Sequence, residues 1–98
     1  MATFITLAKF TGQGVKNVKD TTKRARKFME LARKKKVNYK GIYWTLGRYD
    51  VITVFEAADD ETATSMMLTL ASMGNVSTQT CRAFTAAEMD KILAKVAK

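Results

Sequence analysis

Residues 37–57 read V-N-Y-K-G-I-Y-W-T-L-G-R-Y-D-V-I-T-V-F-E-A. Two runs within this stretch, 37–46 and 49–57, are rich in β-branched and aromatic residues and therefore predict strands. The gap between the runs is too short for a crossover connection, so the two strands are expected to pair as an antiparallel hairpin. The hairpin lies near the middle of the chain, so the remaining elements are assigned before it and after it.

The residues before the hairpin predict a strand and a helix. Residues 3–10, T-F-I-T-L-A-K-F, are short, apolar and β-branched, which is typical of a strand. Residues 11–14, T-G-Q-G, are expected to form a loop. The helix begins between Asn17 and Thr21 and runs to about Lys35, because its apolar residues recur at helical spacing.

The residues after the hairpin predict a helix, a strand and a second helix. Residues 59–61, D-D-E, place three carboxylates at the positive end of the first of these helices, and Gly74 stands where its C-terminal cap belongs. Residues 75–84, N-V-S-T-Q-T-C-R-A-F, predict the fourth strand. Thr85 and Glu88 have the spacing of a capping box, which begins a last amphipathic helix.

The order β-α-β-β-α-β-α predicts an α+β fold. It is the ferredoxin-like βαββαβ pattern with an extra C-terminal helix, and residues 1–98 are expected to form a single domain. This fold has one four-stranded antiparallel sheet with both main helices on one face. The strands are nevertheless apolar on both faces: Val51 and Phe55 point one way, and Ile52 and Val54 point the other. We therefore expect a second copy of the sheet to cover the bare face, which makes the protein a homodimer or a higher oligomer built from dimers.

Composition excludes several classes of chemistry. The 98 residues include no histidine, which removes the Ser-His-Asp triad, His-ligated haem and ordinary zinc sites, so no metal and no cofactor are expected. Cys81 is the one cysteine, so an intrachain disulfide is impossible. No apolar run reaches the roughly 20 residues that span a bilayer, and the first ten residues lack a signal-peptide pattern. We expect a cytoplasmic protein without a membrane partner.

The positive charge is concentrated in one segment. The net charge of the chain is +8, yet residues 16–40 hold eleven Lys or Arg against Asp20 and Glu30, a local net charge of +9. This basic helix is either a solvated face or a surface for nucleic acid or an acidic protein. Nucleic-acid binding is expected to be non-specific at most, because the helix has no set of Asn, Gln and Arg that reads base edges. The candidate residues are Lys23, Arg26, Lys27, Arg33, Lys34, Lys35 and Lys36.

The turn of the hairpin brings a cation, a phenol and a carboxylate together. Gly47 supplies the positive φ of a tight turn, and Asp50 accepts backbone hydrogen bonds, in a structural interpretation. In a functional interpretation, Arg48 attracts an anion, Tyr49 orients a ligand and Asp50 acts as a base or a hydrogen-bond acceptor. The sequence contains no recognisable nucleophile–base pair. No catalytic residue is therefore assigned, and enzymatic activity stays an open question.

Two aromatic residues and one arginine are further ligand-binding candidates. Alternation places Trp44 and Tyr43 on opposite faces of their strand, with Ile42 and Leu46 beside Trp44 and with Tyr39 beside Tyr43. One of the two faces the space between paired sheets, either as packing or as an aromatic wall for a flat organic ligand.

The arginine, Arg82, lies in the fourth strand, where a charge needs a partner. An ion pair between chains is favoured over a ligand contact.

Three segments together resemble the GYD-domain family. They are T-G-Q-G-V-K-N-V-K-D-T-T-K-R (11–24), L-G-R-Y-D-V-I-T-V-F-E-A-A-D-D-E (46–61) and G-N-V-S-T-Q-T-C-R-A-F (74–84). The family is named after its Gly-x-Tyr-Asp turn, which matches Gly47, Tyr49 and Asp50. The resemblance implies a dimeric α/β barrel of two ferredoxin-like sheets, a fold that also serves cofactor-free monooxygenases and ligand-sensing domains. The run Arg33-Lys34-Lys35-Lys36 departs from the small or glycine-containing turn expected there.

Fold and composition together favour one function class. We expect a homodimeric binder of a small organic molecule, or a cofactor-independent enzyme, with its cavity between the paired sheets. The alternative is a binding module that uses the basic helix on nucleic acid or on an acidic protein. A role in assembly without a ligand is the third possibility.

Overall fold

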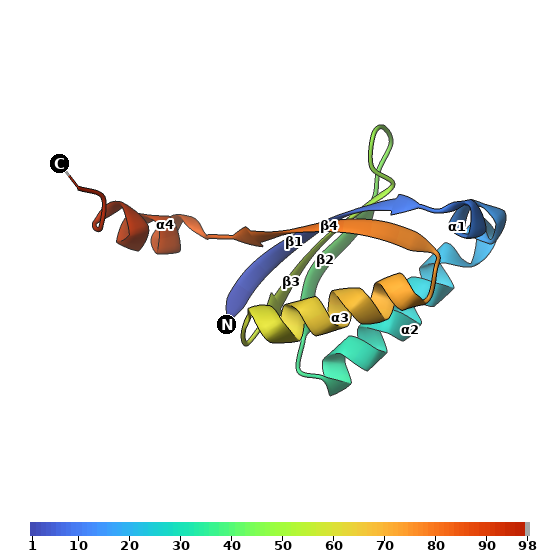
Figure 1. Ribbon diagram of the computed structural model, residues 1–98, viewed down its shortest axis with the longest axis horizontal. Coiled ribbons are helices and arrows are strands. Elements are labelled where there is room, and N and C mark those ends of the chain that lie inside the picture. Colours follow the sequence, from blue (N-terminus) through green and yellow to red (C-terminus); the bar gives the residue numbers. More distant parts are fainter. Residues whose placement is uncertain (98) are drawn as a thin grey trace.

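The fold is a four-stranded antiparallel sheet with helices on one face, as a computed structural model that describes residues 1–97 shows (Figure 1). The strands are β1 (Ala2–Phe10), β2 (Asn38–Trp44), β3 (Val51–Ala57) and β4 (Val76–Ala83). Their order in the sheet is β2-β3-β1-β4, and every neighbouring pair is antiparallel. This confirms the predicted ferredoxin-like α+β architecture.

Two long helices, α2 (Thr21–Lys34) and α3 (Asp60–Ser72), lie side by side against the sheet (Figure 1). Before α2 come the short α1 (Gly12–Lys16) and a 3₁₀ turn η1 (Val18–Asp20), so the loop predicted for residues 11–14 is wrong. Helix α1 forms because the Thr11 hydroxyl accepts a hydrogen bond from the Gly14 N–H at 3.1 Å. A Cβ on Gly14 would lie 2.0 Å from the Asn75 carbonyl oxygen, so this close approach to the start of β4 requires glycine.

The core lies between the helices and the sheet. Phe4 of β1 and Phe55 of β3 stack with their ring centroids 5.3 Å apart, and Tyr39 of β2 lies 5.3 Å from Phe55. Phe28 of α2 meets the Tyr39 ring edge-on at 6.3 Å. The remaining buried members of this cluster are Ala32, Val37, Ala57, Ala63, Met66 and Met67. Aromatic stacking therefore fixes the distance of α2 from the sheet.

Strand β2 differs from its prediction in two ways. A bulge between Tyr39 and Gly41 shifts the register against β3, so Tyr39 shares the helix-covered face with Ile42 and Trp44. The prediction that Tyr39 and Tyr43 share a face is therefore wrong. The strand also ends at Trp44, and Leu46 is fully exposed in the connecting loop rather than part of the strand.

Helix ends follow the predicted caps. The Asp59 carboxylate caps α3 by accepting the Thr62 N–H at 2.8 Å, and Gly74 ends that helix at φ +81°. Helix α4 (Ala86–Leu93) begins with the capping box of Thr85 and Glu88, as the sequence predicted.

One face of the sheet is uncovered. Ile5 and Leu7 of β1 alternate with buried residues, as do Ile52 and Val54 of β3, so these four side chains occupy the face away from α2 and α3. Helix α4 does not cover them, because it extends away from the body at the end of β4 (Figure 1). The exposed apolar residues on or next to α4 are Phe84, Met89, Leu93 and Val96. Among the described residues, no helix is long and apolar enough to cross a membrane.

Candidate functional site

The carboxylate of Asp50 holds the hairpin to β1. Its Oδ2 accepts the Phe10 N–H at 2.8 Å, and the Asp50 N–H donates to the Ala8 carbonyl at 2.8 Å. The Thr45 N–H donates to the Asp50 carbonyl, also at 2.8 Å, which closes the turn. Gly47 has φ +123°, where a side chain would be strained. These contacts give Gly47 and Asp50 a structural role.

Tyr49 lies at the edge of the bare face. Its hydroxyl donates to Gln79 Oε1 of β4 at 3.3 Å, which connects the turn to the far edge strand. The Lys9 Nζ and the Arg48 guanidinium carbon lie 5.9 and 6.0 Å from the Tyr49 ring centroid. The turn therefore gathers two cations around one phenol, and the sequence had indicated only Arg48. Tyr43 lies on the same bare face and is 63% exposed.

Trp44 and Arg82 lie apart from the turn cluster. Trp44 faces the helices and donates its Nε1–H to the Thr21 hydroxyl at 3.1 Å, so of the two aromatic candidates only Tyr43 faces the bare side. The Arg82 guanidinium lies 4.5 Å from the Phe84 ring and 5.6 Å from the Phe4 ring, and it donates to the carbonyls of Thr3 and Ala83. Arg82 thus finds partners within its own chain, at the other end of β1 from Asp50. The predicted ligand residues do not form one site.

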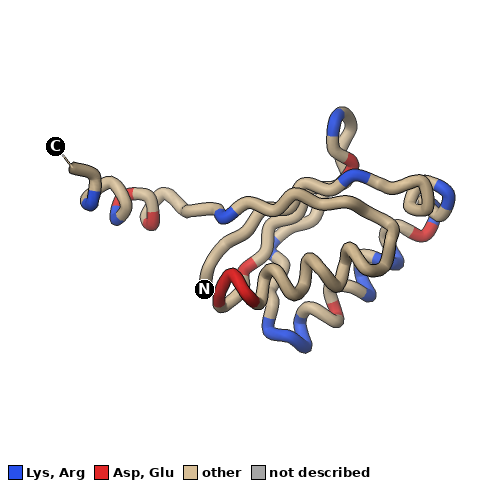
Figure 2. The backbone as a smooth tube through the Cα atoms, in the orientation of Figure 1, with Lys and Arg blue, Asp and Glu red and all other residues tan. Residues whose placement is uncertain are grey.

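Helix α2 and the residues that follow it are rich in Lys and Arg (Figure 2), and most of these cations are exposed. Among the described residues the one salt bridge joins Lys40 to Glu56, so the cations of α2 have no carboxylate within 4.0 Å. Glu30 is the one acid on this helix, and it lies between Arg26 and Arg33 along one side. Arg26, Glu30 and Arg33 line a surface groove of about 260 Å³ beside β2. The exposed cations of this surface, which we call the basic face, are Lys23, Arg26, Lys27, Arg33, Lys34, Lys35 and Lys36.

The last residue of the basic face has an unusual backbone. Lys36 has φ 61°, in the left-handed region that favours glycine. Its N–H donates to the Arg33 carbonyl at 3.0 Å, and the Val37 N–H donates to the Ala32 carbonyl at 2.9 Å. These two bonds are the Schellman motif, in which the left-handed residue is usually glycine. A lysine therefore stands at a position where the backbone favours glycine.

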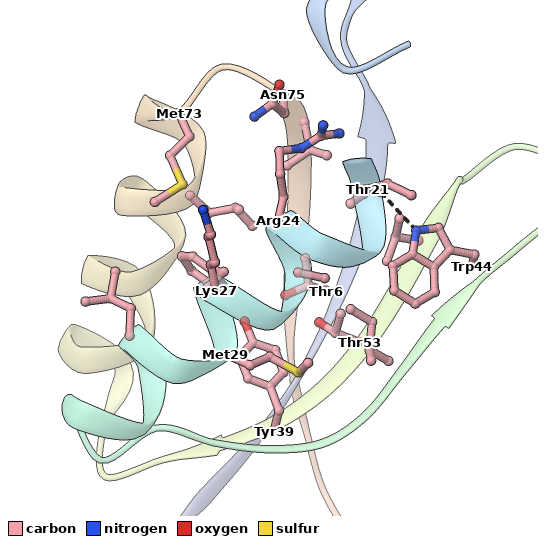
Figure 3. Close-up of a pocket in the computed structure, with 18 residues that line it drawn as sticks. Thr6, Thr21, Arg24, Lys27, Met29, Tyr39, Trp44, Thr53, Met73 and Asn75 are labelled. Atoms are coloured by element: carbon pink, nitrogen blue, oxygen red, sulfur yellow. Dashed lines mark hydrogen bonds between the residues drawn. The ribbon is translucent and has the colours of Figure 1, made fainter. Parts of the chain in front are cut away.

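A cavity of about 270 Å³ lies between α2, α3 and the sheet (Figure 3). No residue pattern predicts this cavity, because it is a gap in helix packing rather than a motif. Its walls are mostly apolar, and Thr53 of β3 and Tyr39 of β2 contribute two hydroxyls. The remaining polar lining includes Arg24, Lys27 and Asn75. Burial raises the pKa of the Tyr39 hydroxyl well above its ordinary value, so the phenol stays neutral.

Comparisons with known proteins found a family model and a sequence relative. The family model described as GYD domain matches residues 4–93. A protein of Thermus thermophilus named glutamine synthetase and cystathionine beta-lyase binding protein is 37% identical over 90 residues. The match covers 91% of this chain and 95% of that protein. No solved structure matches the chain.

Proposed function

Since the chain belongs to the GYD-domain family, we propose that it is a protein-binding module which docks its basic face on an acidic surface of a partner enzyme. The observation that carries this proposal is the unpaired charge of the basic face, because its cations are exposed and, within residues 1–97, have no carboxylate within 4.0 Å. The 37% identical relative is named for binding two enzymes, which supports a protein partner over a nucleic acid. Glutamine synthetase and cystathionine β-lyase are the first partners to test.

The groove beside α2 supplies a place for the contact. Arg26 and Arg33 flank it, and Met29, Val37 and Tyr39 contribute apolar surface between them. Two guanidinium groups bind carboxylates with bidentate geometry more readily than ammonium groups do. An acidic side chain of the partner is therefore expected in this groove, with the surrounding lysines increasing the association rate.

The module is proposed to act as a homodimer. Ile5, Leu7, Ile52 and Val54 give the bare face an apolar centre that a second copy of the sheet would bury. Because α2 lies on the opposite side of the sheet, such a dimer would leave both basic faces free. Two identical faces would make binding to an oligomeric enzyme bivalent and strengthen a weak single contact.

A small organic ligand between the paired sheets is the second candidate function. It is favoured by the 63% exposure of Tyr43 on the bare face, with Arg48 and Tyr49 at the edge of that face. The phenol rings would stack on a flat molecule. A ligand of this kind would add to protein binding rather than replace it, because the two surfaces lie on opposite sides of the sheet.

Charge variants on α2 test the proposal by a gain as well as a loss of binding. The chain is titrated by biolayer interferometry against glutamine synthetase and cystathionine β-lyase of the organism that encodes it. Glu30→Lys should tighten binding roughly three- to ten-fold, because it replaces the one repulsive charge in the groove. Lys23→Glu with Lys34→Glu should weaken binding by at least as much, and the effect should shrink as salt is raised.

The matched control makes the same charge changes at Lys91 on α4 and at Lys95 just after it. Lys91→Glu with Lys95→Glu alters the net charge equally at the opposite end of the molecule. Equal losses in the two double variants would mean that only net charge matters, and that would overturn the assignment of the basic face. Absence of binding by the native chain to either enzyme would leave the GYD-family membership intact but remove these two partners.

A further inference from the structure

We propose that the cavity between α2, α3 and the sheet binds a compact, uncharged, mostly apolar molecule that carries one hydroxyl or carbonyl group. This cavity lies between α2 and the sheet, outside the space between paired sheets, although Lys27 of the basic face and the groove residues Met29 and Tyr39 also line it. The inference does not depend on the proposed protein partners. The supporting observations are the volume of the cavity, the chemistry of its walls and one buried hydroxyl without a partner.

The volume fits a single substituted ring. The cavity measures about 270 Å³, and an apolar cavity of roughly 150 Å³ is sufficient for benzene. Met29 and Leu70 supply flexible apolar walls from the two helices, and Ile42 and Val51 supply the floor from the sheet. Walls of this kind favour a hydrocarbon body and exclude a permanent charge from the interior.

One hydroxyl in the cavity has no hydrogen-bond partner. Thr53 is buried, with 8% of its surface exposed. Among the described residues, its Oγ1 is the one buried side-chain polar atom without a hydrogen-bond partner. The neighbouring Thr6 hydroxyl differs, because it donates to Met67 Sδ at 3.4 Å and shares a hydrogen bond with the Thr80 hydroxyl at 3.0 Å. A buried hydroxyl without a partner is costly, so Thr53 marks the position of the polar group of a ligand.

The Tyr39 phenol adds a second neutral polar group. Its side chain and that of Thr53 point into the same interior space from neighbouring strands (Figure 3). A tyrosine phenol is neutral near pH 7, and burial raises the pKa of Tyr39 further, so it offers a hydrogen bond without a charge.

The two cations that line the cavity keep their charges at its rim. Arg24 donates its Nη1–H to the Asn17 carbonyl at 2.6 Å, which holds the guanidinium outside. Lys27 contributes its aliphatic stem, and its ammonium points away from the Thr53 hydroxyl (Figure 3). The interior therefore presents hydroxyls and carbon, which fits a neutral ligand.

Two probes that differ by one hydroxyl test the proposal. Toluene and p-cresol are titrated into the full chain, and dissociation constants are taken from the methyl signals of Met29, Leu70 and Met73 in ¹H–¹³C spectra. Native protein should bind p-cresol at least five-fold more tightly than toluene. Thr53→Val should reduce this ratio to about one without weakening toluene, because valine keeps the shape of the site and removes the hydroxyl.

Three further variants complete the experiment. Thr53→Ser retains the hydroxyl and should retain the preference for p-cresol. Thr78→Val, on the same sheet face but outside the cavity lining, should behave as the native chain does. Ala25→Leu adds a side chain to the wall and should weaken both probes. Equal binding of both probes by the native chain, a preference that survives Thr53→Val, or no shift of these methyl signals would each overturn the proposal.

Discussion

Replacing Lys36 by glycine should make the protein more stable. Lys36 has φ 61°, and the two hydrogen bonds of the Schellman motif hold it there. The left-handed conformation costs a residue with a Cβ about 1–2 kcal/mol. Glycine avoids that cost but loses more backbone entropy on folding, which offsets up to roughly 1 kcal/mol of the gain. The expected net stabilisation is therefore about 1 kcal/mol.

Lys36→Ala is the matched control for this change. Alanine removes the charge but keeps the Cβ, so the backbone strain stays and the stability should lie within about 0.5 kcal/mol of the native value. Differential scanning calorimetry at one protomer concentration compares the three proteins, because an oligomer melts in a concentration-dependent way. A stabilisation of about 1 kcal/mol should raise Tm by roughly 4–8 °C for a domain of this size.

The two variants also separate strain from charge in binding. If the lysine is retained for its charge, Lys36→Gly and Lys36→Ala should weaken binding to a partner enzyme equally, while only Lys36→Gly raises Tm. Equal melting of Lys36→Gly and Lys36→Ala would refute the claim that the left-handed backbone strains this position.

Three further outcomes are expected from the structure. Asp50→Ala should cost about 1–3 kcal/mol in urea unfolding, because the Phe10 N–H loses its acceptor, whereas Tyr49→Phe should change stability by less than about 0.5 kcal/mol. Hydrogen bonds from Thr62 lower the pKa of Asp59 below its ordinary value of 3.8. The Asp59 carboxylate should therefore stabilise the protein relative to Asp59→Asn fully above pH 3.8, and this advantage should vanish as the pH falls through the lowered pKa of the folded state. Tm values of the two proteins across acid pH measure the difference. Val54→Asp should convert a dimer to monomer or unfold it, because a charge would enter the proposed interface, and a native chain that sediments as a folded monomer would contradict this.

Most of the fold follows from local sequence signals. The hairpin, the Asp59 cap of α3 and the capping box of Thr85 and Glu88 are patterns within a few residues, and each is observed. The errors arise where tertiary contacts override local pattern. Helix α1 forms in a predicted loop because Thr11 caps it and Gly14 allows its close approach to Asn75. The bulge after Tyr39 reverses the face of one aromatic residue.

The candidate sites were less predictable than the fold. The charge of the basic face is additive and could be counted along the chain, so it was identified from the sequence. The turn residues were identified too, but the partners Lys9 and Gln79 come from other strands and depend on sheet register. The cavity at Thr53 depends on the distance between helices and sheet, which no residue pattern encodes.

Lysine labelling in the presence of a partner enzyme tests the central claim most directly. The chain is acetylated with and without glutamine synthetase or cystathionine β-lyase, and each lysine is quantified by mass spectrometry. The proposed docking of the basic face predicts that Lys23, Lys27 and Lys34 lose reactivity in the complex, while Lys91 and Lys95 on and after α4 stay as reactive as in the free chain. Protection confined to Lys91 and Lys95, or equal reactivity of all lysines in a complex that demonstrably forms, would contradict it.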